Sequence, residues 1–259
     1  MKTIIKNIIL ANKDYNLIED QDIIGVGISG GKDSLLLLYA LNTYKIVIKK
    51  TLNKDIKIIG IHINMGFNNM NFDKIDQFCL KNNIELKHFN SKIYNILLLN
   101  KKNNKLQCSL CSTLIKGAVV NYCKKLNCNK IAYGHHLDDA IETLFMNMIY
   151  GARIATFQPK MYLSDQDITF IRPFIYINEE QIIQVINNIK IPVVESTCPN
   201  DKNTQRTHIK NKLNKFYHEY PMAKKNFKKM LYNKKQVSLW GDILPPPTLK
   251  LRGGGFLFE

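Results

Sequence analysis

Long apolar runs are missing from this 259-residue chain. No run approaches the about 18 consecutive apolar residues that indicate a membrane-spanning helix, so the sequence predicts no membrane helix. The apolar N-terminal segment is interrupted by Lys6 and Asn7, and no small-residue cleavage site follows it, which argues against a secretory signal. We therefore expect an intracellular, cytoplasmic protein that begins with a short amphipathic helix.

Acidic residues are scarce relative to basic ones: 21 Asp and Glu against 37 Lys and Arg leave a net charge of +16. Such an excess favours a polyanionic partner and suggests nucleic acid. The heavy use of Lys, Asn and Ile is also what an AT-rich genome produces, so composition explains part of the excess. With 45% hydrophobic residues the chain is able to bury a full core. Its length fits one large domain, or one domain and a tail.

Strand-like and helix-like apolar patterns alternate along the chain, without an evident internal repeat. The predicted strands are residues 23–28, 56–64, 84–89, 130–134, 168–174 and 191–194. The predicted helices are residues 32–41, 72–82, 91–105, 111–126, 139–150 and 179–189. This alternation predicts an α/β fold, a parallel sheet with helices on both faces. Ligands of such sheets bind beyond the carboxyl ends of the strands, where all the motifs described below fall.

The chain changes character toward its C-terminus. Lysines and asparagines crowd residues 202–236, which predicts basic helices, and the Pro- and Gly-rich end from Leu244 predicts a flexible tail. We therefore expect an N-terminal helical segment (1–21), a nucleotide-binding domain with the candidate site (22–199) and a basic extension with the tail (200–259).

The first predicted strand ends abruptly in Ser-Gly-Gly-Lys-Asp-Ser, and an apolar helix follows. Adjacent glycines leave backbone N–H groups uncovered, and the start of a helix adds further N–H groups and a positive dipole end. Lys32 adds a cation, and the Asp33 carboxylate is able to hold Mg²⁺. The stretch predicts a phosphate cradle whose residues are Ser29, Gly30, Gly31, Lys32, Asp33 and Ser34.

Two other phosphate loops fit this stretch less well. The Walker loop has Gly-x-x-x-x-Gly-Lys followed by Ser or Thr, but Val26 stands at the first glycine and Asp33 follows the lysine. Gly25-x-Gly27-x-x-Gly30 fits the dinucleotide fingerprint, which expects an acidic residue near the end of the second strand. The second predicted strand ends without one. A turn that has this composition by chance is the remaining alternative.

A second motif, Gly-His-His-Leu-Asp-Asp at residues 134–139, follows another predicted strand. Gly134 lets backbone approach a nucleotide, and Asp138 and Asp139 lie at a helix start, where the dipole stabilises carboxylates. Such a pair is able to bind Mg²⁺ and orient phosphates, so we predict catalytic roles for Asp33, Asp138 and Asp139. The alternative is that Asp138 only caps the helix while Asp139 is solvated.

The chain has six cysteines, and a cytosolic protein of this size should not depend on disulfides. Cys108 and Cys111 are spaced to hold one metal at a helix start, and Cys198 follows the last predicted strand and can reach the same sheet edge. Three thiolates suit an iron–sulfur cluster with one open iron or zinc with a fourth ligand; the first two alone also suit a redox pair. Predicted to be ordinary buried thiols are Cys79, Cys123 and Cys128.

Together these motifs resemble the tRNA 2-thiocytidine synthetase family, a PP-loop branch of tRNA thiolation enzymes. The resemblance covers roughly residues 15–210. Its markers are the cradle at 29–34, Cys108-x-x-Cys111, the motif at 134–139, Asn147-Met148-x-Tyr150-Gly151, Ile171-Arg172-Pro173, Cys198 and Gln205-Arg206. The zinc-finger cysteine pairs that flank related thiouridine enzymes are absent, and lysidine synthetase relatives lack the three cysteines.

The resemblance implies ATP-dependent thiolation of a tRNA base, most simply a cytidine of the anticodon loop, with ATP, Mg²⁺ and a [4Fe–4S] cluster as cofactors. The ATP phosphates would lie on the cradle and its adenine near backbone at Ile61–Ile63, so Ile63 and Gly134 are candidate nucleotide contacts. The base carbonyl oxygen would attack the α-phosphate, while Mg²⁺ and Lys32 offset the charge of the departing pyrophosphate.

The three cysteines 108, 111 and 198 would hold the cluster, whose open iron carries the sulfide that displaces AMP. Lys116, one helical turn beyond Cys111, is a candidate for orienting the adenylate or the base; a solvated lysine is the alternative. Family members often carry a second cysteine just before the third ligand, but Ser196-Thr197 stands there, which argues against an additional persulfide-carrying cysteine.

The implied partners are tRNA and a sulfur donor, such as a cysteine desulfurase or free sulfide, and relatives are commonly homodimers. Three alternatives stay open: thiolation of a uridine, cluster-dependent desulfuration of a base, and a non-enzymatic nucleotide- or zinc-binding protein. Desulfuration needs no ATP, so the intact cradle counts against it. The intact Lys32, Asp33 and Asp139 count against a decayed loop.

Overall fold

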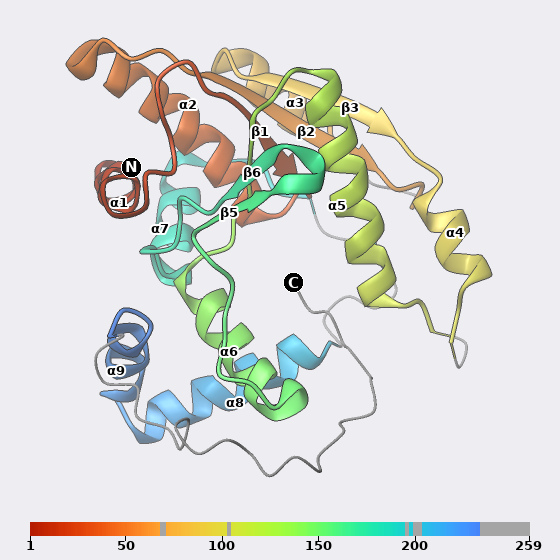
Figure 1. Cartoon of the computed structure of the whole chain (residues 1–259), viewed down its shortest axis with the longest axis vertical. Coiled ribbons are helices and arrows are strands. Elements are labelled where there is room, and N and C mark those ends of the chain that lie inside the picture. The colour runs from red at the N-terminus through yellow and green to blue at the C-terminus, as the bar shows by residue number, and fades with distance from the viewer. Residues whose placement is uncertain (68–70, 103–104, 195–196, 199–203, 234–259) are drawn as a thin grey trace. The chain divides into compact units, whose positions relative to one another are not determined.

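The computed structural model describes residues 1–67, 71–102, 105–194, 197–198 and 204–233 (Figure 1). The chain forms two compact units, one of Met1–Ala140 with Gln158–Thr204 and one of Ile141–Phe157 with Gln205–Glu259. The three-part division predicted from composition stays a prediction. The predicted C-terminal tail lies outside the described residues. In the parts of the chain that are described, no helix is long and apolar enough to cross a membrane.

The first unit is built on a six-stranded sheet with the order β3-β2-β1-β4-β6-β5. The strands are β1 (Ile23–Ile28), β2 (Lys57–Asn64), β3 (Glu85–Asn90), β4 (Lys130–Ala132), β5 (Lys160–Leu163) and β6 (Ile168–Ile171). All neighbours pair in parallel except β5, which pairs antiparallel with β6 at the edge. The predicted α/β class is confirmed. Because β1 lies between β2 and β4, the two sequence motifs that follow β1 and β4 leave the sheet side by side.

Helices of the first unit cover both faces of this sheet (Figure 1). They are α1 (Lys2–Tyr15), α2 (Lys32–Leu52), α3 (Asp73–Lys81), α4 (Ile93–Leu99), α5 (Cys108–Lys125) and α7 (Glu179–Ile189), and the short η1 (Ser164–Gln166) follows β5. A Cβ at Gly25 would meet Cys123 of α5, whereas one at Gly60 would meet Leu38 of α2. Successive positions of paired strands point to opposite faces, so α2 and α5 lie on opposite sides of β1 and β2.

The helix after the cradle is the core of the unit. Four consecutive leucines, Leu35 to Leu38, are at most 2% exposed, and α2 contacts α1, α7, β1 and β2. A helix that is apolar all round is buried on all sides. The predicted amphipathic N-terminal helix is confirmed as α1, which buries Ile4, Ile8 and Ala11 along one stripe. The helix that begins at the cradle is therefore anchored by its buried leucines, while Lys32 and Asp33 in its first turn stay partly exposed.

Several predicted boundaries are wrong. Residues 191–194 form no strand: Pro192 has no N–H to donate to a ladder, and the Val194 N–H donates to the Gly30 carbonyl instead (3.0 Å). The helix predicted at 91–105 ends at Leu99, and α5 begins three residues earlier than predicted, at Cys108. The edge strand β5 was not predicted, because four residues give too short an alternation to recognise.

A buried ion cluster joins the connection before β1 to β4. The Lys130 ammonium lies 2.7 Å from an Asp22 carboxylate oxygen and 2.8 Å from a Glu19 carboxylate oxygen, and both Lys130 and Asp22 are buried. The Asn129 amide also donates to Asp22 (2.7 Å). These bonds hold β1 and β4 in register where the two motif-bearing strands begin.

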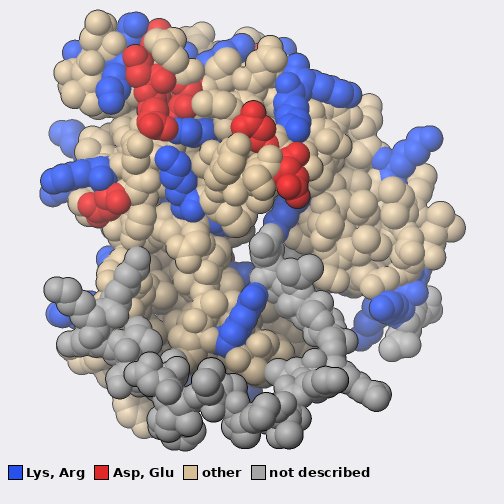
Figure 2. Space-filling view, in the orientation of Figure 1, with Lys and Arg blue, Asp and Glu red and all other residues tan. Residues whose placement is uncertain are grey.

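The second unit contains the later part of α6 (Leu137–Gly151), with α8 (Gln205–Glu219) and α9 (Ala223–Met230). The predicted basic helices in residues 202–236 are confirmed by α8 and α9. Phe145 of α6 and Phe227 of α9 lie 5.1 Å apart between ring centroids. On the face shown in Figure 2, Lys and Arg side chains are scattered over the described surface, and Asp and Glu gather in the upper part of the view.

Candidate active site

The turn after β1 is closed by its own hydroxyl groups. The Ser34 hydroxyl donates to the Gly31 carbonyl (3.0 Å) and accepts from the Ser29 N–H (3.3 Å), and the Gly31 N–H donates to the Ser29 hydroxyl (3.3 Å). Gly30 has φ of 87°, which only glycine adopts without strain. Among the described residues no side chain caps the start of α2 at Gly31. The first-turn N–H groups of α2 therefore suit an anion.

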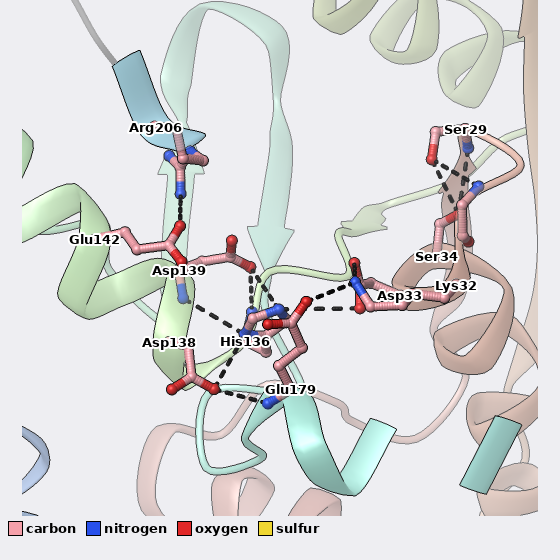
Figure 3. Close-up of polar contacts among 11 residues, drawn as sticks. Ser29, Lys32, Asp33, Ser34, His136, Asp138, Asp139, Glu142, Glu179 and Arg206 are labelled. Carbon is pink, nitrogen blue, oxygen red and sulfur yellow. Dashed lines mark hydrogen bonds and ion pairs between the residues drawn. The ribbon is translucent and has the colours of Figure 1, made fainter. Parts of the chain in front are cut away.

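Lys32, the first residue of α2, lies between two carboxylates (Figure 3). Its ammonium nitrogen is 3.2 Å from Asp33 Oδ2 and 3.0 Å from Oε1 of Glu179, the first residue of α7. Burial lowers the pKa of Lys32, but the charges of Asp33 and Glu179 outweigh burial, and the net pKa is raised. Lys32 is therefore a cation held in place at the predicted phosphate cradle.

Gly134 is required by the close approach of two backbones. A Cβ at this position would lie 2.9 Å from the carbonyl carbon of Asp33 and 3.0 Å from the nitrogen of Ser34. The end of β4 therefore lies directly against the first turn of α2. The approach is to protein backbone; the predicted contact between Gly134 and a nucleotide stays a prediction.

His136 lies at the centre of the second motif and is 3% exposed. The backbone N–H of His136 donates to Asp139 Oδ2 (2.9 Å), and the ring Nδ1 of His136 accepts from the backbone N–H of Asp139 (3.4 Å). Its Nε2 is 3.4 Å from Asp139 Oδ2 and 3.9 Å from Asp33 Oδ1 (Figure 3). The ring thus connects the cradle to the Asp-Asp pair. The sequence motif contains His136, but no role was predicted for it, because the sequence does not show which of two adjacent histidines points inward.

Asp138 accepts a hydrogen bond from the backbone N–H of Glu179 (2.7 Å). The carboxylate therefore lies at the start of α7, in addition to its place in the first turn of its own helix α6. Glu179 closes the network, because its N–H binds Asp138 while its carboxylate binds Lys32. Sequence reasoning missed Glu179: an acidic residue at a helix start is common, and nothing local separates this one from Glu180.

The Asp33 carboxylate is the best-placed cation ligand in this network. Its Oδ1 is fully buried and has no hydrogen-bond partner among the described residues. Burial raises the pKa of Asp33, while Lys32 and His136 lower it. A buried carboxylate oxygen without a donor suits a divalent cation. Asp33 and Asp139, both within 4 Å of His136 Nε2, thus fit a magnesium ion in the chemistry of their donors.

The three predicted cluster cysteines lie in one neighbourhood. Cys108 and Cys111 share the first turn of α5, and the pKa of Cys111 is raised to about 11 by burial and then by the charges of Cys198 and Cys108. In the described parts of the chain, no three His, Cys, Asp or Glu side chains are close enough together to hold a metal ion. The thiols therefore fit a metal centre in donor type, whereas the described structure does not bring them to the distances of metal ligands. The other three cysteines are buried, as predicted.

The remaining predicted residues lie on the elements that surround this edge. Ile63 is buried near the end of β2 and packs in the core beneath α5. Lys116 lies on α5, partly buried, five residues beyond Cys111. Arg172 is buried after β6, and its guanidinium donates to the Gln158 carbonyl. The nucleotide and base contacts predicted for Ile63 and Lys116 stay predictions.

Two family markers lie in the second unit. Arg206, at the start of α8, contacts Glu142 Oε2 (3.3 Å) and the Thr143 hydroxyl (3.1 Å) on α6. The neighbouring Gln205 accepts a hydrogen bond from the Tyr150 hydroxyl (2.8 Å). These markers therefore join α8 to α6 within that unit.

Comparison with known proteins identifies the family to which the chain is similar. A family model described as a PP-loop domain matches residues 2–216. A relative from Geotalea uraniireducens (strain Rf4), named tRNA-cytidine(32) 2-sulfurtransferase, is 34% identical over 85% of this chain and 86% of its own length. One of the same name from Aliivibrio fischeri (strain MJ11) is 33% identical over 85% of this chain and 71% of its own length.

Among solved structures, the U34-tRNA thiolase NcsA from Methanococcus maripaludis, solved with its [4Fe-4S] cluster, has a similar fold. Its TM-score is 0.69 and its sequence identity 22%, and the match covers 92% of this chain and 79% of that chain. The resemblance identified from the sequence motifs is confirmed by the family match and the curated relatives. The chain belongs to the PP-loop family, in the branch formed by the tRNA-cytidine(32) 2-sulfurtransferases.

Proposed function

We propose that this protein is an ATP-dependent tRNA sulfurtransferase that converts a cytidine of the anticodon loop to 2-thiocytidine. The observation that carries the proposal is the contact between the two motifs: Gly134 brings the end of β4 against the first turn of α2, so that Lys32 and Asp33 face His136 and Asp139. A cation, an uncapped helix start and paired carboxylates then surround the position that a nucleoside triphosphate would occupy.

Phosphate binding follows from the charges at the cradle. The N–H groups at the start of α2 and the Lys32 ammonium would bind the β- and γ-phosphates. Asp33 and Asp139 would hold Mg²⁺, which supplies positive charge where pyrophosphate departs. Four carboxylates, Asp33, Asp138, Asp139 and Glu179, lie around the one cation Lys32 in this network, so we infer that ATP enters as its magnesium complex.

Activation of the base is a phosphoryl-type transfer. The carbonyl oxygen of the base attacks the α-phosphorus; a carbon–oxygen–phosphorus linkage forms, the bond to the β-phosphate oxygen breaks, and pyrophosphate leaves. Lys32 and the helix start stabilise the negative charge that moves onto pyrophosphate. Glu179 keeps the Lys32 ammonium beside the cradle while this charge develops. Replacement of the adenylate by sulfur then releases AMP.

The sulfur site is proposed for Cys108, Cys111 and Cys198. These thiolates would hold a [4Fe–4S] cluster, which when bound supplies an open iron for a sulfur atom. Support comes from the pKa of Cys111, which the charges of Cys198 and Cys108 raise in addition to burial. Lys116, five residues along α5, is the residue that we propose orients the adenylate or the base.

The choice of tRNA and of cytidine follows the names of the relatives at 30–34% identity. The net charge of +16 and the lysine-rich helices α8 and α9 suit a nucleic-acid substrate, and a tRNA substrate suits a cytoplasmic protein. A cysteine desulfurase or free sulfide as sulfur donor, and a homodimer, stay part of the proposal. Uridine is the alternative base.

The proposal is tested with tRNA nucleosides from a strain that lacks the gene. We expect 2-thiocytidine to disappear on deletion and to return with the wild-type gene, but not with Lys32→Met or Cys111→Ser; Cys79→Ser, at an ordinary buried thiol, is the matched control. If all thiolated nucleosides persisted in the deletion strain, the thiolation proposal would be wrong. Loss of a thiouridine alone would overturn the choice of cytidine.

The metal is tested on the purified chain. Anaerobic iron and sulfide analysis should give about four irons and four inorganic sulfides per chain, as a [4Fe–4S] cluster requires. Cys111→Ser should lose both, whereas Cys79→Ser should keep them. Stoichiometric zinc without iron would contradict the cluster.

A further inference from the structure

Beside the cradle, three polar side chains form a hydrogen-bonded row that the proposed function does not use. His62 on β2 and His88 on β3 are register partners, and their Nδ1 atoms are 2.8 Å apart. His88 Nε2 is 2.7 Å from Oδ1 of Asp76 on α3. His62 is 7% exposed, whereas His88 and Asp76 are at the surface. The row therefore runs from solvent inward to β2.

The row determines which nitrogen of His62 carries a proton. Asp76 can only accept, so His88 donates through Nε2, and with a neutral ring its Nδ1 is an acceptor. His62 must then donate through Nδ1 to His88, which leaves His62 Nε2 as an acceptor. Burial, together with the charge of His88, lowers the pKa of His62 to about 4. At neutral pH and above, His62 is thus a neutral ring with a lone pair on Nε2.

This lone pair is open to a ligand. Nε2 of His62 makes no hydrogen bond to any residue that the structure describes, and it is not among the fully buried polar atoms that lack a partner. Solvent therefore reaches it, although the ring as a whole is buried. A well-oriented acceptor that is reachable from solvent is one that a bound molecule is able to use.

The acceptor belongs to a side chain that neighbours the phosphate cradle. Nδ1 of His62 contacts His88 on β3, so Nε2 lies on the side of the ring away from β3, and β1 is the strand on that side of β2. The register partner of His62 on β1 is Ile28, the residue before Ser29. Phe72 stacks on the His62 ring with centroids 3.7 Å apart, and its Cζ lies 3.1 Å from the position of a Cβ on Gly30. His62, Phe72 and the cradle are thus neighbours.

We propose that His62 is a specificity-determining residue that accepts a hydrogen bond from a ribose hydroxyl of the bound ATP. In dinucleotide-binding sheets the same task falls to an acidic residue near the end of the second strand. The second strand here has no such residue, and His62 supplies an acceptor two residues before its end. Phosphate oxygens carry no proton to donate at this pH, so the donor belongs to the nucleoside part of ATP.

The inference rests on the proposed ATP binding, and the test uses affinity for ATP and its analogues at pH 8, well above the lowered pKa of His62. Binding to the full chain is measured by calorimetry with Mg²⁺ and ATP, 2′-deoxy-ATP, 3′-deoxy-ATP or the analogue that lacks the 6-amino group. We expect the wild-type chain to bind one of the two deoxy analogues roughly 3- to 10-fold more weakly than ATP, the range of one neutral hydrogen bond.

Two matched variants isolate the nitrogen. The amide of His62→Asn occupies the place of Nδ1 and keeps the bond to His88, but nothing occupies the place of Nε2; the amide of His62→Gln occupies the place of Nε2. His62→Asn should bind ATP as weakly as the wild-type chain binds the deoxy analogue, with no further loss on removal of the hydroxyl. His62→Gln should recover part of the discrimination. Phe72→Leu keeps Nε2 of His62. This variant should therefore keep the ratio between the affinities for ATP and for the deoxy analogue, even where both affinities fall.

The failures are distinguishable. A wild-type chain that bound no ATP would contradict the proposed function, and this inference with it. ATP binding with the same deoxy ratio in wild type and His62→Asn would overturn only the role of His62. If His62→Asn abolished the discrimination against the analogue that lacks the 6-amino group, and not the discrimination against a deoxy analogue, the assignment to the ribose would be overturned. Thermal unfolding of each variant establishes that the chain is folded in the assay.

Discussion

At the scale of single residues, the candidate site depends on contacts that leave no room for substitution. Gly134 has backbone atoms of α2 at 2.9 and 3.0 Å from where its Cβ would be, and these cannot move like a flexible side chain. Lys32, by contrast, is held by charge, between Asp33 and Glu179. The cradle thus combines one steric requirement with one electrostatic one.

Gly134→Ala should weaken ATP binding at least tenfold and destabilise the chain by roughly 1–3 kcal/mol, because the added methyl group separates β4 from α2. Gly117→Ala is the control: it lies within α5, a Cβ there meets nothing within 4 Å, and alanine should stabilise the helix by up to about 1 kcal/mol. Calorimetric ATP affinity and urea unfolding check both. Equal behaviour of the two variants would contradict the steric account.

At the scale of elements, the strand order decides which loops meet. β1 is central, with β2 and β4 as neighbours, so the cradle is flanked by the His62 row on one side and by the His136 motif on the other. The ion cluster of Lys130, Asp22 and Glu19 joins the segment before β1 to β4. The packing of these elements therefore positions the site before any ligand is bound.

Lys130→Met should destabilise the chain by about 3–5 kcal/mol, because it leaves the buried Asp22 carboxylate without its cation. Lys57→Met is the control, since Lys57 pairs with Glu85 at 3.3 Å on the surface, and exposed pairs contribute about 1 kcal/mol or less. Urea unfolding at pH 7.5 measures both. A loss near 1 kcal/mol for Lys130→Met would show that water replaces the missing cation.

The His62 row also makes stability depend on pH. The pKa of His62 is lowered to about 4 in the folded chain, against 6.5 for an unperturbed histidine, so in that window the unfolded chain binds the extra proton. The His62 contribution is therefore complete above about pH 6.5 and is lost progressively as pH falls toward 4. Urea unfolding of wild type and His62→Asn at pH 7.5 and 5 should show a smaller acid loss in the variant. An equal loss would exclude His62 as its source.

At the scale of the whole molecule, charge rather than shape is the informative quantity. The chain carries +16, and α8 and α9 hold lysines in both helices. A polyanion that binds such a chain releases counterions, so affinity falls steeply with salt. A lysine excess produced by codon bias alone, by contrast, would not have to favour any particular partner.

Binding of a tRNA should therefore weaken by at least about tenfold between 50 and 200 mM salt. Filter binding or fluorescence anisotropy on the full chain measures this, with ATP affinity as a comparison that should change less. Flat salt dependence of tRNA binding would indicate that the basic residues do not meet phosphates and that the lysine excess is compositional.

Local patterns were sufficient for the α/β class and for the strand and helix on either side of each motif, whereas the binding roles of the two motifs stay predictions. A strand, a glycine turn and an apolar helix are recognisable within about a dozen residues of sequence, because the turn needs glycine and the buried elements need apolar side chains. Prediction failed where neighbours in space decided the outcome. Val194 bonds the cradle at Gly30 and not a strand, and the helix predicted at 91–105 stops at Leu99.

By itself the sequence determined the chemistry that is available: a cation and carboxylates after β1 and β4, and three thiols that we predict to hold one metal centre. Tertiary structure alone decided which groups meet. Glu179 reaches Lys32, His136 joins Asp33 to Asp139, and His62 contacts His88, because strand order and helix packing bring together residues far apart in the chain. Residue type is encoded locally, whereas distance between side chains is set only when the sheet forms.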